Sequence, residues 1–585
     1  MTRRRLLYGL VLLGALALAF AIPRGNRVPR PRIRVAIIDP YASAELVDYA
    51  RYRTDLASGN LYILRTISQS GQSYLSYRVA LTLARDPRLP IAERLEHYRR
   101  VLELRIDDPL ARSEKRSLYL EIARTAEAGG FIQQALDAYQ QALPEEAAVE
   151  GSKRLEGNPY RLSNALYKAR LYREALEALD GRSAPSIEAP AYRALGEYQE
   201  ALDAYQRWLD EQPDNLDARF GEAWSYFYLE ELGEAEQLFR QLPGSRALYG
   251  RALIANRQGD IDRAVALLEQ SGSADNLWLA SGLYEAKDRY REAIPLYLKL
   301  AAGNSSYADD AAYRAYTLAK RLGDERLADS AREMIPKQSF FSLKVGGAIE
   351  APQASTLPYQ QPAVLRLARA LARANDFEAA IGELSFALRD TQDEATAIAI
   401  AELLQNYGEF RQSQRAAQRF IAAGSRDLRT WRVAYPQAYS SVVLRETERS
   451  GVEPELVWAV MRKESSFFPQ AVSRSNAKGL MQVIPSTWKW LAELQGEAPG
   501  DPFDPADNIR YGTFYLGWLG NFFSGDAELM IASYNRGQGY IKRLYEGSIV
   551  QEDKDELYRE IDTLETREYL QAVALNYRIY KVLYQ

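Results

Sequence analysis

A short phrase that recurs along the middle of the sequence constrains the fold more than any other feature. It has a small or polar residue, an apolar residue two positions later, and Ala (once Ser) three positions after that. The clear copies are 196–201, 259–264, 288–293, 375–380 and 408–413, and weaker ones end at Ala135, Ala175, Ala235 and Ala328. Four residues after the Ala, most copies carry a bulky apolar residue, namely Tyr139, Leu179, Tyr205, Phe239, Leu268, Tyr297 or Leu384. Such offsets place the groups on one helix face, where Ala lets a partner helix approach closely. The copies recur about every 30 residues, which predicts an all-α fold of irregular helix-turn-helix repeats.

Stacking of these repeats would form a curved surface. The stretch from Leu195-Gly196-Glu197-Tyr198 to Tyr205, followed by Pro213, resembles a tetratricopeptide repeat. Because one such repeat cannot bury its faces alone, an array of them forms a superhelix with a concave surface. That surface can bind a peptide or an extended polymer, or the array can be a rigid frame for another domain. The sequence leaves both interpretations open.

The domain boundaries follow from where the periodicity stops. We expect tetratricopeptide-like repeats over residues 23–335. Residues 336–362 are rich in Pro, Gly and Ser and predict a linker. Further helical repeats are expected over 363–434, up to the break at Tyr435-Pro436. Residues 435–585 then remain as one domain of about 150 residues.

The N-terminus predicts export. Arg3-Arg4-Arg5 precede an apolar run from Leu6 to Ile22, and small-x-small sites lie within that run. This pattern is typical of a signal peptide over residues 1–22. An uncleaved N-terminal anchor is the second interpretation, because the run is at the short end of a membrane span. Either way we expect the mature chain in the periplasm or cell envelope. A membrane contact would be made through residues 6–22.

Composition excludes several kinds of chemistry. Lys plus Arg is 74 and Asp plus Glu is 78, so the formal charge of 74 − 78 = −4 gives no basic footprint for nucleic acid. The chain has no Cys, which excludes disulfides and thiolate nucleophiles, and its one His, His97, lies on a charged segment as a surface or packing residue. Any reaction must therefore use carboxylates, hydroxyls and amides, and no metal or cofactor is expected.

One carboxylate stands out in the C-terminal domain. A helix is expected over 453–464, with Pro454 in its first turn and an apolar stripe at Val457, Val460 and Met461. Glu464 continues that stripe. A carboxyl group on a buried face has a raised pKa, as a general acid at neutral pH requires. The alternative is a Glu that forms an ion pair at a helix end, with Arg462 or Lys463.

Four further motifs follow Glu464-Ser465 in the sequence. They are Gly479-Leu480-Met481-Gln482, Asn508-Ile509-x-x-Gly512, Tyr534-Asn535-x-Gly537 and Glu565-Thr566-x-x-Tyr569. Ser473 lies between Glu464-Ser465 and the first of them. Helix starts are expected after Ile484-Pro485, at Asp504-Pro505 and at the capping residue Asp526. In this order, the five motifs resemble the soluble lytic transglycosylase family over residues 435–585. The resemblance implies a lysozyme-like α-helical catalytic domain behind a helical superhelix, and cleavage of peptidoglycan glycan strands.

The resemblance also implies roles for single residues. Glu464 matches the family's catalytic acid, and Ser473 and Gln482 match residues that contact the sugar near the cleaved bond. Tyr534 matches a tyrosine that forms a hydrogen bond near that acid, and Asn535 matches the amide beside it. Glu565 and Tyr569 match one wall of the substrate groove. Ser465, Gly479 and Met481 belong to the same motifs and are included among the substrate-binding residues. We expect Gly479 to let the substrate approach the backbone. The sequence departs from the family pattern at Lys463, Ser533, Arg536 and Asp562-Thr563, and Arg536 changes the local charge.

The implied mechanism uses one carboxyl group, whereas most glycosidases use two. Glu464 would protonate the bond between N-acetylmuramic acid and N-acetylglucosamine. The 2-acetamido group would stabilise the cation, and Glu464 would then deprotonate the C6 hydroxyl to give a 1,6-anhydro sugar. Tyr534 is expected to tune the proton of Glu464. The alternatives are a lysozyme-type hydrolase, a catalytically silent glycan-binding scaffold, and an amidase or peptidase, which would lack its usual Cys or His. The expected partners are the glycan strands and, through the repeats, cell-wall synthesis proteins.

Overall fold

The computed structural model describes residues 44–58, 61–69, 73–104, 112–473, 475–546, 561 and 564–585. The predicted signal or anchor at 1–22 and the departure at Asp562-Thr563 lie outside these residues. The described residues are helical apart from loops and three isolated β-bridges, so the predicted all-α fold is confirmed. No described helix is both long and apolar enough to cross a membrane. The chain divides into two compact units, residues 81–345 and residues 1–80 with 346–585.

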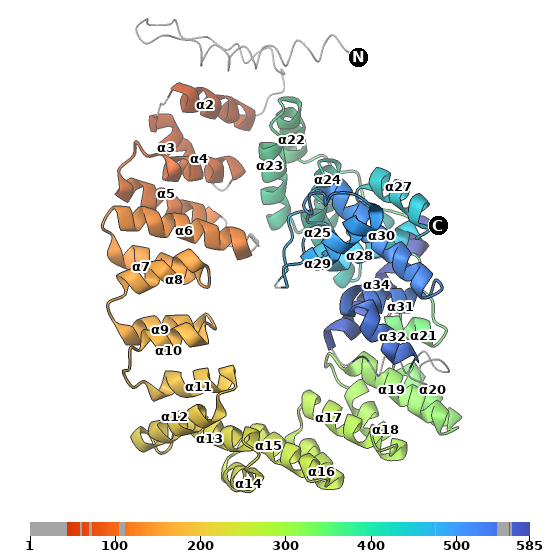
Figure 1. Cartoon of the computed structure of the whole chain (residues 1–585). Helices are drawn as coiled ribbons and strands as arrows, with labels where there is room; N and C mark the ends of the chain where they lie inside the picture. Colours follow the sequence, from red (N-terminus) through yellow and green to blue (C-terminus); the bar gives the residue numbers. More distant parts are fainter. Residues whose placement is uncertain are drawn as a thin grey trace, which may run out of the picture. The chain divides into compact units, whose positions relative to one another are not determined.

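The unit of residues 81–345 is an array of helices, each packed on the next in sequence (Figure 1). Its helices are α5 (Ile91–Leu104), α6 (Arg112–Ala128), α7 (Ile132–Ala142), α8 (Glu146–Leu155), α9 (Pro159–Lys168), α10 (Tyr172–Ala178), α11 (Pro185–Leu195), α12 (Tyr198–Glu211), α13 (Leu216–Tyr228), α14 (Leu232–Gln241), α15 (Gly244–Arg257), α16 (Ile261–Ser271), α17 (Ala274–Glu285), α18 (Tyr290–Ala301), α19 (Ala308–Arg321), α20 (Glu325–Glu333) and α21 (Phe340–Lys344). The repeat phrase lies at the second helix of each pair, and its Ala residues at 201, 264 and 293 are fully buried.

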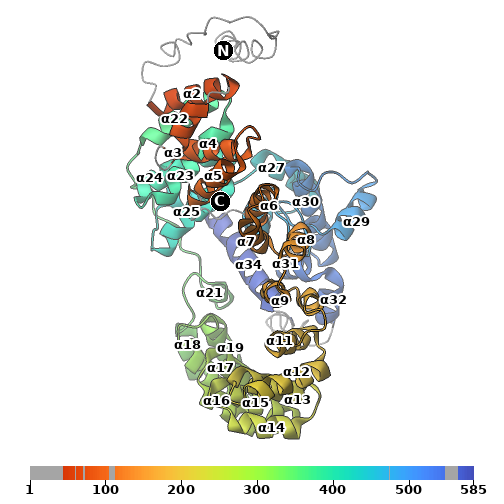
Figure 2. The same cartoon turned by 90° about the vertical axis from the view of Figure 1, so that its left-hand side faces the viewer.

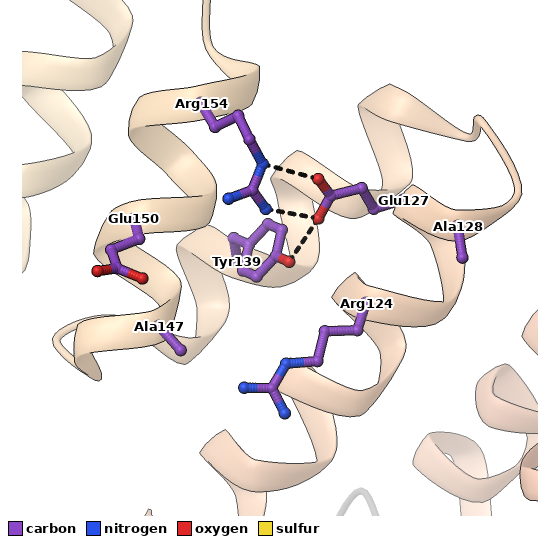
Figure 3. A pocket seen from close by; sticks show the side chains of 7 residues that line it. All are labelled: Arg124, Glu127, Ala128, Tyr139, Ala147, Glu150 and Arg154. Atoms are coloured by element: carbon purple, nitrogen blue, oxygen red, sulfur yellow. Dashed lines mark hydrogen bonds and ion pairs between the residues drawn. The ribbon is translucent and has the colours of Figure 1, made fainter.

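The bulky residue of the phrase joins neighbouring repeats. Tyr139 of α7 donates a hydrogen bond of 2.7 Å to Glu127 of α6, and Arg154 of α8 contacts the same carboxylate at 2.8 Å (Figure 3). Tyr297 repeats the arrangement with Glu285 at 2.6 Å. A Cβ at Gly151 would lie 2.5 Å from the Tyr139 ring, so only glycine lets α8 pack there. The repeats are therefore held by buried tyrosines as well as by apolar contacts.

The second unit begins with helices from the start of the chain. These are α2 (Ala44–Ser58), α3 (Leu61–Gln69) and α4 (Tyr74–Arg85), whose last turn passes into the first unit. They pack on α22 (Ala363–Arg373) and α23 (Phe377–Asp390) in both views (Figure 1, Figure 2). Tyr49 donates to Glu383 at 2.6 Å, and Arg78 contacts Asp376 at 3.1 Å. The repeat pattern did not indicate this pairing, because no local signal connects residues so far apart in sequence.

The expected linker, 336–362, contains a short helix, α21, that the sequence did not predict. Beyond it the chain is extended, and Gln353 forms a parallel bridge with Asp427. The Asp427 carboxylate accepts hydrogen bonds of 3.0 Å from Ser355 and from the Thr356 backbone. The described helices α24 (Glu394–Asn406), α25 (Phe410–Ala422) and α26 (Leu428–Ala434) follow α23.

The C-terminal domain surrounds one central helix. Its described helices are α27 (Ser440–Ser450), α28 (Pro454–Ser465), α29 (Pro485–Gln495), α30 (Pro505–Phe522), α31 (Ala527–Arg536), α32 (Gln538–Glu546) and α34 (Leu564–Tyr584). The predicted starts at Pro454, Pro485, Asp504 and Asp526 are confirmed, and both Asp side chains accept backbone hydrogen bonds as caps. Every residue of α28 from Leu456 to Met461 is buried, so this helix forms the core of the domain.

Arg462 attaches the central helix α28 to the preceding repeats. Its guanidinium donates to the side chains of Gln414 and Gln418 on α25 and to the carbonyl oxygen of Ala434. It also lies 4.0 Å from the centroid of the Tyr435 ring. These contacts therefore hold the last turn of α28 against the preceding helical repeats.

Candidate active site

Glu464 lies in the last turn of α28, where the helix ends in an unusual way. Ser466 and Phe467 both have left-handed backbone, with φ of 52° and 62°, although neither is glycine. Such residues cost about 1–3 kcal/mol each and gather at functional sites. The Phe467 side chain is fully buried and repays part of this cost. The chain thus turns sharply just after Glu464.

The Glu464 carboxyl group is part-exposed but surrounded by protein. Burial raises its pKa to about 7, and the negative charge of Glu565 acts in the same direction. The Tyr569 hydroxyl and the Lys463 ammonium lower the pKa, but by less than burial raises it. A substantial fraction of Glu464 is therefore protonated near neutral pH.

The ion-pair interpretation of Glu464 is not supported. Arg462 is bound to α25 and the Ala434 carbonyl, as described above. Lys463 is exposed, and it forms no salt bridge with Glu464 among the residues that the structure describes. The attraction of the Lys463 charge lowers the pKa of Glu464 by less than burial raises it, so that pKa stays at about 7. The carboxyl group is thus set up to hold a proton.

Two tyrosines lie close to Glu464. Burial, together with the Glu464 charge, raises the pKa of Tyr534 and Tyr569 well above the ordinary value, so both stay protonated. Tyr569 directs its hydroxyl towards Glu464 closely enough to lower the pKa of that carboxyl group. The contact does not meet strict hydrogen-bond geometry, and the hydroxyl has no other partner in the described part of the chain. Tyr534 instead donates to the Met481 carbonyl oxygen at 2.9 Å.

The loop 479–482 lies against the end of α28. Ser465 is buried, and its hydroxyl donates to the Leu480 carbonyl oxygen at 2.7 Å, which ties the loop to the residue after Glu464. Gln482 donates its amide to the carbonyl oxygens of Gly479 at 2.8 Å and Ala471 at 3.1 Å. Its side-chain carbonyl oxygen has no hydrogen bond to any described residue, so this acceptor is the part available to a substrate.

Close packing explains why residue 479 is a glycine. Its φ is +79°, and a Cβ would lie 2.2 Å from both the Asn508 amide and the Pro502 carbonyl oxygen. These neighbours belong to the protein. The expected reason for this glycine, approach of a substrate to the backbone, is therefore replaced by close packing against α30. Met481 is fully buried beside Gly512, so it too supports the loop from beneath.

Asn508 belongs to one of the five motifs, but the sequence assigned it no role. It is fully buried at the start of α30. Its oxygen accepts from the Met481 backbone at 2.7 Å, and its amide donates to the carbonyl oxygens of Lys478 at 3.0 Å and Pro502 at 2.8 Å. One side chain thus satisfies three backbone groups of the loop. The sequence could not show this role, because the three backbone groups come near Asn508 only in the folded chain.

The remaining predicted residues lie at the edge of the site. Asn535 accepts a hydrogen bond of 2.8 Å from Thr566, which joins α31 to α34. Glu565 is exposed, and its charge reaches Glu464. Ser473 is exposed on the loop after α28, and its hydroxyl accepts from the Ala477 backbone at 3.0 Å. Arg536 lies with its guanidinium 4.7 Å from the Tyr540 ring centroid.

Chemically, the site contains a carboxyl group that can give up and regain a proton near neutrality, two neutral tyrosines and a loop held in place by buried hydrogen bonds. A separate cavity of about 390 Å³ lies among α6, α7 and α8 of the other unit (Figure 3). The charged groups that Figure 3 shows bonded there, Glu127 and Arg154, are paired with each other. That cavity is a joint between repeats.

Comparison with known proteins bears on the C-terminal domain most directly. Residues 441–556 match the model of the transglycosylase SLT domain, and residues 192–256 match a tetratricopeptide repeat. Over 120 residues the chain is 42% identical to membrane-bound lytic murein transglycosylase C of Yersinia pestis strain Pestoides F and of Yersinia pseudotuberculosis strain IP 31758. That match covers 18% of this chain and 33% of each relative, so the chain spans about a third of the length of these relatives.

Solved structures resemble the chain over most of its length. The 70 kDa soluble lytic transglycosylase of Escherichia coli matches with a TM-score of 0.56 at 17% identity, over 92% of this chain and 96% of that one. The complex of the 70 kDa soluble lytic transglycosylase with bulgecin A gives 0.58 at 18% identity, over the same shares. An inactive mutant of lytic transglycosylase Slt from Pseudomonas aeruginosa gives 0.50 at 21%, over 97% and 96%. At these identities the likeness establishes the fold, a helical superhelix with a lysozyme-like domain. Residues 441–556, which contain Glu464 and its surrounding loop, are the part of the chain that matches the transglycosylase SLT domain.

Proposed function

We propose that the chain is a peptidoglycan lytic transglycosylase. It cleaves the β-1,4 bond between N-acetylmuramic acid and N-acetylglucosamine without water and leaves a 1,6-anhydro end. The observation that carries the proposal is the pKa of Glu464, raised by burial to about 7 beside two neutral tyrosines. The SLT domain match and the lytic murein transglycosylase relatives support the same activity.

The first step is proton transfer to the leaving group. Protonated Glu464 gives its proton to the glycosidic oxygen, the bond from C1 of N-acetylmuramic acid to that oxygen breaks, and N-acetylglucosamine leaves as an alcohol. The carbonyl oxygen of the 2-acetamido group bonds to C1 and forms an oxazolinium cation. Glu464 is now an anion. The Tyr569 hydroxyl lowers the pKa of Glu464, which means that it favours this ionised form.

The second step returns the proton. Ionised Glu464 takes the proton of the C6 hydroxyl, the C6 oxygen bonds to C1, and the acetamido oxygen leaves C1. The products are the 1,6-anhydro sugar and Glu464 in its protonated starting form. No water is consumed, so the reaction is a lyase reaction. One carboxyl group suffices because it acts first as acid and then as base.

A hydrolase is the second candidate, and Glu565 is the observation that favours it. A second carboxylate near the acid can activate a water molecule in ordinary glycosidases. Glu565 is close enough for its charge to raise the pKa of Glu464. It is exposed, however, and the effect that the structure gives for it is this action on Glu464. We therefore assign Glu565 to holding the proton on Glu464.

Mass spectrometry of the products from purified sacculi in ¹⁸O-labelled water distinguishes these candidates. A lytic transglycosylase yields anhydro ends without label, whereas a hydrolase yields reducing ends that carry ¹⁸O. Glu464→Gln should lower the rate by about 10²–10⁴-fold, as expected for loss of a general acid–base group. Equal rates for this variant and the wild type would show that Glu464 is not the acid. No released product from the wild type would reject both enzymes and leave a glycan-binding scaffold.

Location and partners extend the proposal. A chain that acts on glycan strands works in the cell envelope, which agrees with the relatives named as membrane-bound and with the export pattern of residues 1–22. The repeats offer a surface for the glycan strand or for cell-wall synthesis proteins. Pull-down of synthesis proteins with the full chain, compared with a chain carrying charge reversals on α6 to α8, tests the second partner.

A further inference from the structure

A row of aromatic side chains leads away from Glu464 along α29 and α30. We call Trp490, Tyr515, Trp518 and Phe522 the aromatic strip. Its ring centroids follow one another at 6.0 Å from Trp490 to Tyr515, 5.2 Å from Trp490 to Trp518 and 5.1 Å from Trp518 to Phe522. The inner end touches the candidate active site, because Tyr515 lies 5.3 Å from Tyr534, whose pKa responds to the charge of Glu464.

Three of the four rings of the strip lie on one face of α30. Tyr515, Trp518 and Phe522 are spaced by three and four residues, which places them above one another on α30. At a rise of 1.5 Å per residue they extend over about 10 Å. Ile509, Leu516 and Leu519 of the same helix are fully buried. The strip therefore lies on a different side of α30 from these core residues.

The outer rings of the strip are accessible. Phe522 is 39% exposed, and Trp490 and Trp518 are partly exposed, whereas Tyr515 at the inner end is buried. Three large rings therefore lie together at a surface, where packing into the core does not explain them. Exposed apolar clusters of this kind mark binding sites. Polar groups flank them. Gln538 accepts the Tyr515 hydroxyl at 2.9 Å, and the Lys542 ammonium lies 5.4 Å from the Phe522 ring centroid.

We propose that the aromatic strip binds sugar rings of the glycan strand beyond the bond that Glu464 cleaves; this rests on the proposed function. The C–H faces of pyranose rings stack on aromatic rings, and the row begins at Tyr515 beside Tyr534, which lies close to Glu464. A stem peptide fits the strip less well. Its carboxylates would need cations, and the cation at the strip, Lys542, already pairs with Glu546 at 3.5 Å.

Binding measurements on the full chain test the strip without requiring activity. Glu464→Gln protein is titrated by calorimetry with glycan strands of increasing length, freed of stem peptides. The strip should make affinity rise with strand length. In Trp518→Ala/Phe522→Ala that rise should flatten, and the longest strands should bind about tenfold more weakly for the loss of two stacking rings. Trp518→Phe/Phe522→Tyr, which keeps both rings, should retain most of the rise.

The matched control is Leu444→Ala, which removes a side chain that is 51% exposed on α27 and lies outside the strip. It should leave the length dependence as in the parent protein. Thermal unfolding shows whether each variant is folded. If Trp518→Ala/Phe522→Ala does not fold, Trp518→Phe/Phe522→Tyr provides the test. Unchanged length dependence in the alanine pair, or a loss seen only with strands that carry stem peptides, would overturn the inference.

Failure of the proposed function gives a different result. If the wild type released reducing ends from sacculi, the transglycosylase reaction would be rejected while the titration of uncleaved strands still reported on the strip. If the wild type formed anhydro ends and long strands bound the alanine pair normally, the strip alone would be rejected.

Discussion

The Tyr534 hydroxyl donates a hydrogen bond of 2.9 Å to the carbonyl oxygen of Met481. The tyrosine beside the acid thus holds the loop in place, and the tyrosine that acts on the proton of Glu464 is Tyr569. From the sequence, Tyr534 was expected to tune the proton of Glu464, and Tyr569 was expected to form part of a wall of the substrate groove. The two roles lead to different results when either hydroxyl is removed.

Tyr534→Phe should lower kcat/KM without moving its dependence on pH. The substitution leaves the Met481 carbonyl oxygen without its partner, which costs about 1–3 kcal/mol of stability for a buried group. Tyr534 is not among the groups that shift the pKa of Glu464. The measurement is a pH–rate profile on sacculi together with thermal unfolding. A shift of the alkaline limb would contradict this assignment.

Tyr569→Phe should move the alkaline limb of kcat/KM to higher pH. The Tyr569 hydroxyl lowers the pKa of Glu464 by stabilising the carboxylate, so its removal raises that pKa. Activity in the first step requires protonated Glu464 and is lost as pH rises through its pKa of about 7. A profile that kept the wild-type midpoint would show that this hydroxyl does not act on the acid. Tyr577→Phe, also on α34, is the control.

Glu565→Gln should have the reverse effect. The charge of Glu565 raises the pKa of Glu464 because two negative charges repel each other. Without it, Glu464 ionises at lower pH and the alkaline limb shifts downwards. If Glu565 were instead the base of a hydrolase, the variant would lose its maximal rate and keep the position of the limb. Salt separates the two cases further, because ions at the exposed Glu565 weaken the effect of its charge on Glu464.

Glu464→Gln should be more stable than the wild type at pH 8. The folded state raises the pKa of Glu464 to about 7 from the usual 4.5. The folded protein therefore binds a proton that the unfolded chain has lost, and wild-type stability falls as pH rises between these values. The difference is at most about 3 kcal/mol, and less where water screens the part-exposed group. Unfolding measured at pH 4 and pH 8 should show equal stabilities at pH 4 and a more stable variant at pH 8.

The sequence predicted those features that have local causes. Pro454, Asp504 and Asp526 marked helix starts because capping and first-turn proline are properties of neighbouring residues. Glu464 could be identified from its place on the apolar stripe. The partners of Arg462 on α25 lie 44 and 48 residues away, and those of Asn508 depend on a folded loop. No periodicity in the sequence encodes such contacts, so the support of the site became clear only from the coordinates.

The pairing of α2 with α23 has a consequence for the order in which the chain folds. Tyr49 and Glu383, joined at 2.6 Å, are separated by 334 positions. At a synthesis rate of about 5–20 residues per second, the first helices wait some tens of seconds for their partners. The intervening array can assemble meanwhile from contacts between successive helices, which form fast. The unit that contains Glu464 is therefore completed last, and the chain gains a working acid only after nearly all of it has been made.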